Sequence, residues 1–138
     1  MQRRVSLRRK SKKRAALDRK ADPWREAFVR TVGQCELCNR DLSYELHCHE
    51  ISAGTASKRK SLMEPSCILV LCNVTHRHNK PSCHREVQLW PRSKQLALLY
   101  LRRPGDFDLA KFHEIVAMRD PDMADIDGWI RVLTNGRA

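Results

Sequence analysis

The chain has 138 residues, enough for one domain with a modest core, and its 27 Lys and Arg against 16 Asp and Glu give a formal net charge of +11. It has no run of about 18 apolar residues and no apolar segment behind its basic N-terminus, so we expect neither a transmembrane helix nor a secretory signal. Six cysteines without an export signal indicate a reducing compartment, where paired cysteines more often bind metal than form disulfides. A cytoplasmic, metal-binding protein is therefore expected.

The basic charge is concentrated at the N-terminus. Residues 1–20 hold ten basic side chains and one acidic one, whereas the other 118 residues hold 17 basic and 15 acidic ones. Such an arm suits a polyanion because each phosphate contact releases condensed counterions, although a solvated tail is the alternative. We expect residues 1–21 to form this arm, with a helical pattern from Ser11 onward. The side chains expected to bind nucleic acid are Arg3, Arg4, Arg8, Arg9, Lys10, Lys12, Lys13 and Arg14.

A helix is predicted directly after the arm. Asp22-Pro23 is typical of an N-cap followed by proline at the first helical position, and Gly33 is placed to end the helix. Between them, mostly apolar residues recur on one helical face, which we expect to pack on the core. The residues of this face are Trp24, Ala27, Phe28, Thr31 and Val32.

Four cysteines form two pairs, Cys35-x2-Cys38 and Cys72-x10-Cys83. Zinc prefers four tetrahedral ligands, and four thiolates close a structural site completely. The ten residues inside the second pair are interpreted as an insertion that bulges out of the second cysteine turn. The alternative is Cys72-x3-His76, in which His76 replaces Cys83 as the fourth ligand at a tighter spacing.

Two short strands are predicted beside these pairs. Residues 44–51 form the first strand, and residues 67–71 form a buried strand that delivers Cys72. Cys48 and Cys67 lie inside apolar segments, so we expect them to be small core residues rather than ligands. The remaining predicted segments of this region are a polar basic loop at residues 52–61, an exposed loop at residues 73–82 and a helix that begins near Cys83-His84.

The C-terminal third is predicted to be helical. Pro91 opens a helix that residues 104–105 (Pro-Gly) end, and Asp108 caps a second helix. Residues 120–121 (Asp-Pro) repeat the cap-plus-proline pattern before a third helix, which residues 135–136 (Asn-Gly) end. The apolar stripes of these helices are expected to be core.

The order of these motifs resembles the HNH endonuclease family. The chain has Cys-x2-Cys, then Leu-His-Cys-His-Glu-Ile at residues 46–51, an apolar strand ending in Leu-Cys, and Cys83-His84. The match covers residues 24–90, and the downstream segments 90–91, 95–98 and 107–109 also resemble phage-encoded HNH-like proteins with a His-Glu-Ile motif. It implies an α+β fold with a zinc-stapled ββα-metal (HNH, treble-clef-like) core at residues 22–90 and a C-terminal helical extension at residues 91–138. It also implies a bacterial or phage-infected host cell.

The resemblance implies a divalent-metal-dependent DNA endonuclease or nickase that uses Mg²⁺ or Mn²⁺. Phosphodiester hydrolysis needs a base with a near-neutral pKa and a cation against the developing charge, and imidazole suits the first task. We therefore expect His49 and His84 to hold the catalytic metal, with His49 or Glu50 as the general base. His47 and His113 are expected to have no catalytic role. The structural zinc would bind Cys35, Cys38, Cys72 and Cys83.

Two positions depart from the family pattern. The family asparagine corresponds to Cys67, and the last family histidine corresponds to Gln88, a poor metal ligand. These departures favour the alternative of a catalytically reduced or inactive, zinc-stapled nucleic-acid-binding module. An RNA-binding zinc protein also fits the charge but leaves the His-Glu-Ile segment unexplained. In the endonuclease, the basic loop residues Lys58, Arg59 and Lys60 would bind DNA phosphates together with the arm, although a solvated turn is the alternative for this loop.

Overall fold

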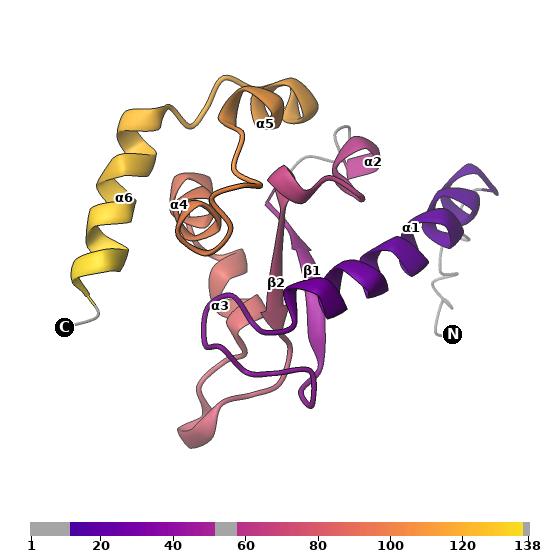
Figure 1. The fold of residues 1–138 in the computed structure, drawn as a ribbon, viewed down its shortest axis with the longest axis horizontal. Coiled ribbons are helices and arrows are strands. Elements are labelled where there is room, and N and C mark those ends of the chain that lie inside the picture. Colours follow the sequence, from indigo (N-terminus) through magenta and orange to yellow (C-terminus); the bar gives the residue numbers. More distant parts are fainter. Residues whose placement is uncertain (1–11, 52–57, 137–138) are drawn as a thin grey trace, which may run out of the picture.

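The computed structural model describes residues 12–51 and 58–136, and it has a mixed α+β fold around a two-stranded sheet (Figure 1). The α+β class predicted from the sequence is confirmed. No helix in the described ranges is long and apolar enough to cross a membrane. The elements are α1 (Lys12–Val32), β1 (Leu46–Glu50), α2 (Lys58–Ser61), β2 (Ile68–Cys72), α3 (Cys83–Gln88), α4 (Arg92–Arg102), α5 (Leu109–Val116) and α6 (Met123–Asn135), with short 3₁₀ turns at Pro65–Cys67 and Arg77–Asn79.

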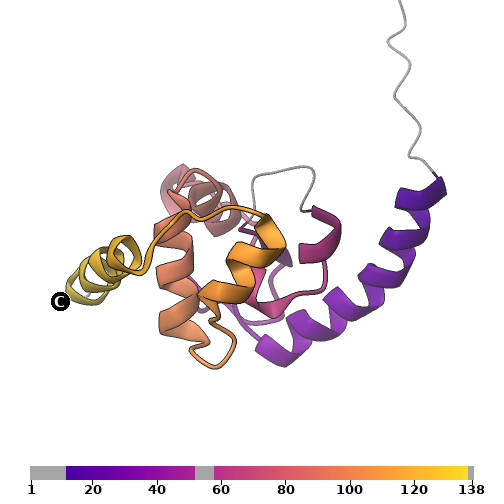
Figure 2. The same ribbon diagram turned by 90° about the horizontal axis from the view of Figure 1, so that it is seen from above.

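The sheet is an antiparallel pair of β1 and β2, in which Leu46 lies opposite Cys72 and Glu50 opposite Ile68. Every residue of β2 is buried, whereas the residues of β1 are half-buried. Helix α1 packs against β1, and α3 and α4 pack against the sheet from the other side, so the sheet lies between them (Figures 1 and 2). This arrangement gives β1 two differently covered faces.

A single hydrophobic core joins the sheet to the C-terminal helices. Leu69 and Leu71 of β2 lie in one cluster with Leu96 of α4, Phe112 of α5 and Ile126 of α6, and all five side chains are buried. Helix α6 packs along α4 at the edge of the molecule (Figure 1). The predicted domain at residues 22–90 and the C-terminal extension at residues 91–138 therefore contribute to one shared core.

Helix α1 begins at Lys12, close to Ser11, from which a helical pattern is predicted, and eleven residues before Pro23, the first helical position that the Asp22-Pro23 pattern indicates. Lys12–Val32 is one helix with Pro23 inside it, so the prediction that Asp22 caps its start is wrong. Proline removes one backbone donor, but the residues before it favour helix, and Ala21 is buried against the fold. The first turns of α1 project beyond the rest of the fold, and the helix curves along its length (Figure 2). An internal proline is a known cause of such bending.

The other boundaries agree in part with the sequence patterns. Ser82 caps α3 and Asp108 caps α5, each by accepting a bond from a backbone N–H three residues later. For α6 the cap is Asp122, which accepts from the Asp125 N–H at 2.9 Å, so the predicted cap at Asp120 is wrong. Residues 58–61 were expected in a loop and form α2, while residues 52–57 lie outside the described residues.

Candidate metal centre and histidine cluster

Four cysteines converge where the turn after α1 lies against the end of β2 and the start of α3. The Sγ atoms of Cys35, Cys38, Cys72 and Cys83 all lie within 4.8 Å of one another. The Cys38 and Cys72 sulfurs are 3.8 Å apart, close to the ~3.8 Å edge of a tetrahedron with metal–sulfur bonds of about 2.3 Å. Three of the four side chains are buried and Cys38 is half-buried. This group could hold a metal ion such as zinc, despite the long interval between its last two members.

The first cysteine pair is shaped by a tight turn that the sheet holds in place. The Cys35 N–H donates to the Arg40 carbonyl at 2.7 Å, and the Asn39 N–H donates to the Cys35 carbonyl at 2.9 Å. Asn39 has a φ of 66°, a left-handed conformation that asparagine tolerates. The Glu36 N–H donates to the Val70 carbonyl at 2.8 Å, and the Glu36 carboxylate accepts from the Val70 N–H at 2.8 Å. The turn is therefore fixed next to the end of β2, which carries Cys72.

A buried ion pair ties this turn to the end of α4. Arg103 Nε donates to Glu36 Oε2 at 2.8 Å, and the Glu36 side chain is only 2% exposed. The same guanidinium donates to Asp106 Oδ2 at 2.6 Å and to the Ile68 carbonyl. A buried carboxylate is stable only when it is paired, so Arg103 joins three parts of the fold around the cysteine turn.

The thiols of the cluster form hydrogen bonds with one another. A hydrogen bond from Cys83 lowers the pKa of the Cys35 thiol, while the same bond and burial raise the pKa of Cys83. Burial also raises the pKa of Cys38. Four thiolates at this spacing repel one another, so a cation is needed to hold them all deprotonated, and its binding would release protons.

His76 lies directly beside the four sulfurs. Its Nε2 atom is 3.6 Å from the Cys72 Sγ and 3.3 Å from the Cys83 Sγ. The set of mutually close ligand atoms contains Cys83 and not His76, so the four-cysteine set fits a tetrahedral site better than the alternative with His76. His76 thus contacts two potential ligands from outside the set. Cys48 and Cys67 lie outside the cluster too.

A second cluster consists of three histidines on one side of the sheet. His49 of β1 and His84 of α3 have ring centroids 5.1 Å apart, and His47 of β1 lies 6.3 Å from His84. His47 and His49 share a face because side chains alternate along a strand. His47 is held by Glu45, whose Oε1 atom lies 2.8 Å from His47 Nε2. The structure therefore brings together the two histidines singled out from the sequence, and it adds His47.

Gln95 of α4 fixes which nitrogen of His49 carries the proton. Gln95 Nε2 donates to the Trp90 carbonyl at 3.0 Å, and a carbonyl can only accept. The amide oxygen of Gln95 must then face His49, whose Nε2 lies 2.7 Å away. His49 Nε2 is therefore assigned as the donor, which leaves the lone pair on Nδ1. Gln95 belongs to the segment 95–98 that shares in the family resemblance, but no role was predicted for it, although it is a polar residue in a buried helical run.

The surroundings of both histidines in the pair favour the neutral imidazole. Burial lowers the pKa of His49, the hydrogen bond with Gln95 opposes that shift, and the charge of His84 adds to it. Burial also lowers the pKa of His84, with further lowering by His47 and Arg25. A neutral imidazole has a lone pair that can accept a proton or bind a metal. The cluster can therefore supply a base, a metal ligand or both.

Glu50 faces the opposite side of β1, toward α1. Arg25 Nη1 lies 3.9 Å from Glu50 Oε1, and the described residues give this carboxylate oxygen no hydrogen bond. Arg25 also donates to the Cys48 carbonyl at 2.8 Å. Because neighbouring strand residues point to opposite faces, Glu50 does not join His49 and His84. The Glu50 side chain, 12% exposed, is enclosed between β1 and α1.

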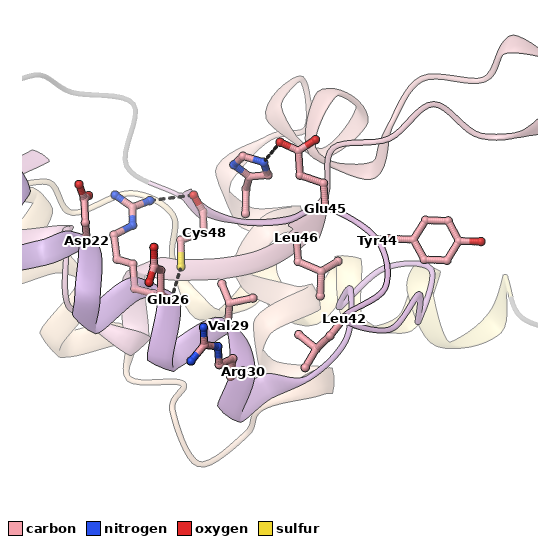
Figure 3. A pocket seen from close by; sticks show the side chains of 11 residues that line it. Asp22, Glu26, Val29, Arg30, Leu42, Tyr44, Glu45, Leu46 and Cys48 are labelled. Carbon is pink, nitrogen blue, oxygen red and sulfur yellow. Dashed lines mark hydrogen bonds and ion pairs between the residues drawn. The ribbon is translucent and has the colours of Figure 1, made fainter.

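A groove of about 620 Å³ runs along this α1 side of β1 (Figure 3). Its walls mix apolar side chains such as Val29 and Leu46 with charges of both signs, including Glu26 and Arg30. His47 also lines the groove, so it borders both the groove and the histidine cluster. The mixed lining carries no single sign of charge.

A polar hollow of about 450 Å³ adjoins His84. Arg85 and Gln88 of α3 line it together with the polar loop residues Asn73 and Thr75. His84 and Gln88 are one helical turn apart, so both side chains lie on the same face of α3. Gln88 therefore occupies the wall of the hollow next to the histidine pair. By contrast, His113 Nε2 lies 2.7 Å from the Pro121 carbonyl, away from this site.

The basic residues predicted to bind nucleic acid are only partly described. Lys12, Lys13 and Lys60 are exposed to solvent. For Arg14, Lys58 and Arg59 the structure describes the helical backbone alone. The other predicted residues of the arm lie outside the described ranges: Arg3, Arg4, Arg8, Arg9 and Lys10.

Comparisons of the chain with protein-family models, with characterised proteins and with solved structures found no match. A function must therefore be argued from the residues and geometry of this chain. Two features carry that argument: the four-cysteine cluster and, next to it, the neutral pair of His49 and His84.

Proposed function

We propose that this protein is a divalent-metal-dependent DNA endonuclease or nickase of the HNH type. The observation that supports it most is the pair of neutral histidines, His49 and His84, whose rings lie 5.1 Å apart beside a polar hollow. The pair comes from a strand and a helix of an α+β fold, as the HNH resemblance implies. The core would be a ββα-metal core, with β1, β2 and α3 as its elements.

In this proposal the four-cysteine cluster binds a structural zinc ion. Four thiolates leave no open coordination position, so a metal bound there would stabilise the fold and would not meet substrate. The donors belong to the turn after α1, the end of β2 and the start of α3. His84 directly follows the ligand Cys83, and His49 lies on the strand paired with β2, so the zinc would fix both histidines.

His49 would act as the general base. Gln95 holds its Nε2–H, so the Nδ1 lone pair is left to accept a proton from the attacking water. His84 would hold the divalent cation, with substrate and water oxygens completing its coordination. Such a cation, when bound, stabilises the negative charge that develops on the phosphate. Burial keeps both imidazoles neutral, which each of these roles requires.

The second candidate is a zinc-stapled nucleic-acid-binding module without catalysis. Among the described residues, the four cysteines are the only group of three or more potential ligands with metal-like spacing. Gln88 stands where the family has its last histidine, and Glu50 faces α1. These features leave the histidine pair with fewer protein ligands for a catalytic metal, which favours binding without cleavage.

A plasmid assay separates the two candidates. Purified full-length protein is incubated with supercoiled plasmid and Mg²⁺, Mn²⁺, Ni²⁺ or Co²⁺, beside a mobility-shift measurement of DNA binding. The endonuclease predicts conversion to open-circle or linear DNA that depends on the added metal. Binding without conversion under every metal would replace it with the binding module. His113→Gln serves as a control for the loss of a histidine outside the cluster.

A further inference from the structure

The insertion between Cys72 and Cys83 forms a basic surface. Residues 73–85 contain no acidic residue, and Arg77, Lys80 and Arg85 are exposed on the loop and the first turn of α3. No carboxylate in the described ranges forms an ion pair with any of these three side chains. We call these three residues the basic loop surface, and its positive charges are free to meet an external anion.

The loop that carries this surface is held from the inside. His76 contacts the sulfurs of the cysteine cluster, and its backbone N–H donates to the Lys80 carbonyl at 3.0 Å. Arg40 Nη1 donates to the Val74 carbonyl at 3.0 Å. These inward contacts use the groups nearest the four-cysteine cluster and leave Arg77 and Lys80 exposed. A loop shaped before binding loses less entropy when a ligand docks on it.

Two hollows lie on this loop, and neither has an acidic residue in its lining. One of about 320 Å³ is lined only by basic and imidazole side chains, and the other, of about 450 Å³, contains His84 and Arg85. The two hollows together are lined by basic, imidazole and uncharged polar side chains and by Pro81. The residues of the first hollow are Arg40, His76, Arg77, His78 and Lys80.

We propose that the basic loop surface binds the sugar–phosphate backbone of the DNA whose scissile phosphate lies at the His49–His84 pair. The charge and the acid-free hollows match a polyanion, since phosphate contacts by Arg and Lys release counterions. The ten-residue insertion would then be a DNA-binding element as well as a spacer between two cysteines. The position of the scissile phosphate rests on the proposed function, whereas the binding of DNA by the loop does not require cleavage.

The test compares two double variants that each remove two positive charges. Arg77→Gln/Lys80→Gln changes the proposed surface, and Arg119→Gln/Arg131→Gln changes exposed positions outside it. Binding of a short DNA duplex is measured without added divalent cation across about 50–200 mM salt. The loop variant should lower the log–log salt slope by about 2, because each phosphate contact contributes ~0.9. The control should keep the wild-type slope.

Equal slopes for the loop variant and the wild type, or equal losses in both double variants, would overturn the proposal. Zinc content and thermal unfolding of each variant establish that the fold is intact. Arg85→Gln changes the third residue of the basic loop surface, on α3, and should lower the salt slope by about 1. Failure of the proposed function has a different signature. A protein that binds DNA with this slope change yet nicks no plasmid retains the DNA-binding surface and lacks the nuclease activity.

Discussion

Gln95→Met tests the assignment of His49 as a base with a fixed tautomer. Methionine keeps most of the side-chain volume but removes the oxygen that faces His49 Nε2 and the N–H that binds the Trp90 carbonyl. Each partner left unsatisfied in a buried position costs about 1–3 kcal/mol of stability. Loss of an orienting partner behind a functional histidine typically reduces activity about 10–100-fold. We expect a folded but destabilised protein with a nicking rate reduced to that extent.

The pH dependence has a definite sign. Burial lowers the pKa of His49 and the bond to Gln95 partly offsets it, so the base stays neutral below its ordinary pKa of about 6.5. The acid limb of the rate profile should therefore lie below that pH in the wild type. Gln95→Met removes the opposing bond and should move the limb to lower pH. Gln95→Glu keeps an acceptor, adds a negative charge that stabilises the imidazolium, and should move the limb to higher pH.

The assay combines plasmid nicking across pH with ¹⁵N NMR of the His49 imidazole. The wild type should show a protonated Nε2 and a bare Nδ1 above the pKa, and Gln95→Met should show a mixture of the two tautomers. A fixed Nε2–H tautomer in Gln95→Met, with the wild-type rate and an unmoved acid limb, would refute the role of Gln95. The NMR result is independent of cleavage, so it also tests the hydrogen-bond assignment in a protein without nuclease activity.

Three further predictions concern the metal centre and its supports. Arg103→Met leaves the buried Glu36 carboxylate unpaired and should lower the free energy of unfolding, measured with denaturant, by about 3–5 kcal/mol. The double variant Arg103→Met/Glu36→Gln should lose less, and an equal loss in the double variant would contradict the pairing. His76→Ala removes the imidazole from the Cys72 and Cys83 sulfurs and should weaken zinc binding about 10–100-fold, while the Co²⁺ spectrum stays that of four thiolates; a spectrum that loses a nitrogen ligand would make His76 a ligand. Chelation of the metal should unfold the core. Zinc affinity should fall as pH falls, because the raised thiol pKa of Cys83 and Cys38 means that binding releases protons. Titration calorimetry in two buffers measures that release of protons.

The cysteine cluster could be predicted because it depends on local spacing and strand order. Cys35 and Cys38 share one turn, and the buried strand delivers Cys72 beside that turn. The proximity of His49 and His84 also follows, since one lies on the paired strand and the other follows Cys83. Strand alternation alone would have placed Glu50 on the other face from His49.

The parts that could not be predicted depend on contacts distant in sequence. Gln95 reaches His49 from 46 residues away, within a helix whose neighbours are apolar core residues. The continuity of α1 through Pro23 could not be predicted, because proline suits the first turn of a helix, whereas packing and helix-forming neighbours carry this helix through it. Asp120 and Asp122 are equally good caps in composition, and only the path of the chain decides between them.

The most direct test of the account measures single-turnover nicking rates for four proteins: wild type, His49→Ala, His84→Ala and the double variant, all with Mn²⁺ and full zinc content. Residues that act as one catalytic unit lose about as much activity singly as together. We predict metal-dependent nicking by the wild type, a large loss in each single variant and no further loss in the double variant. Nicking at the wild-type rate in either single variant would contradict the central claim that this pair forms the active site.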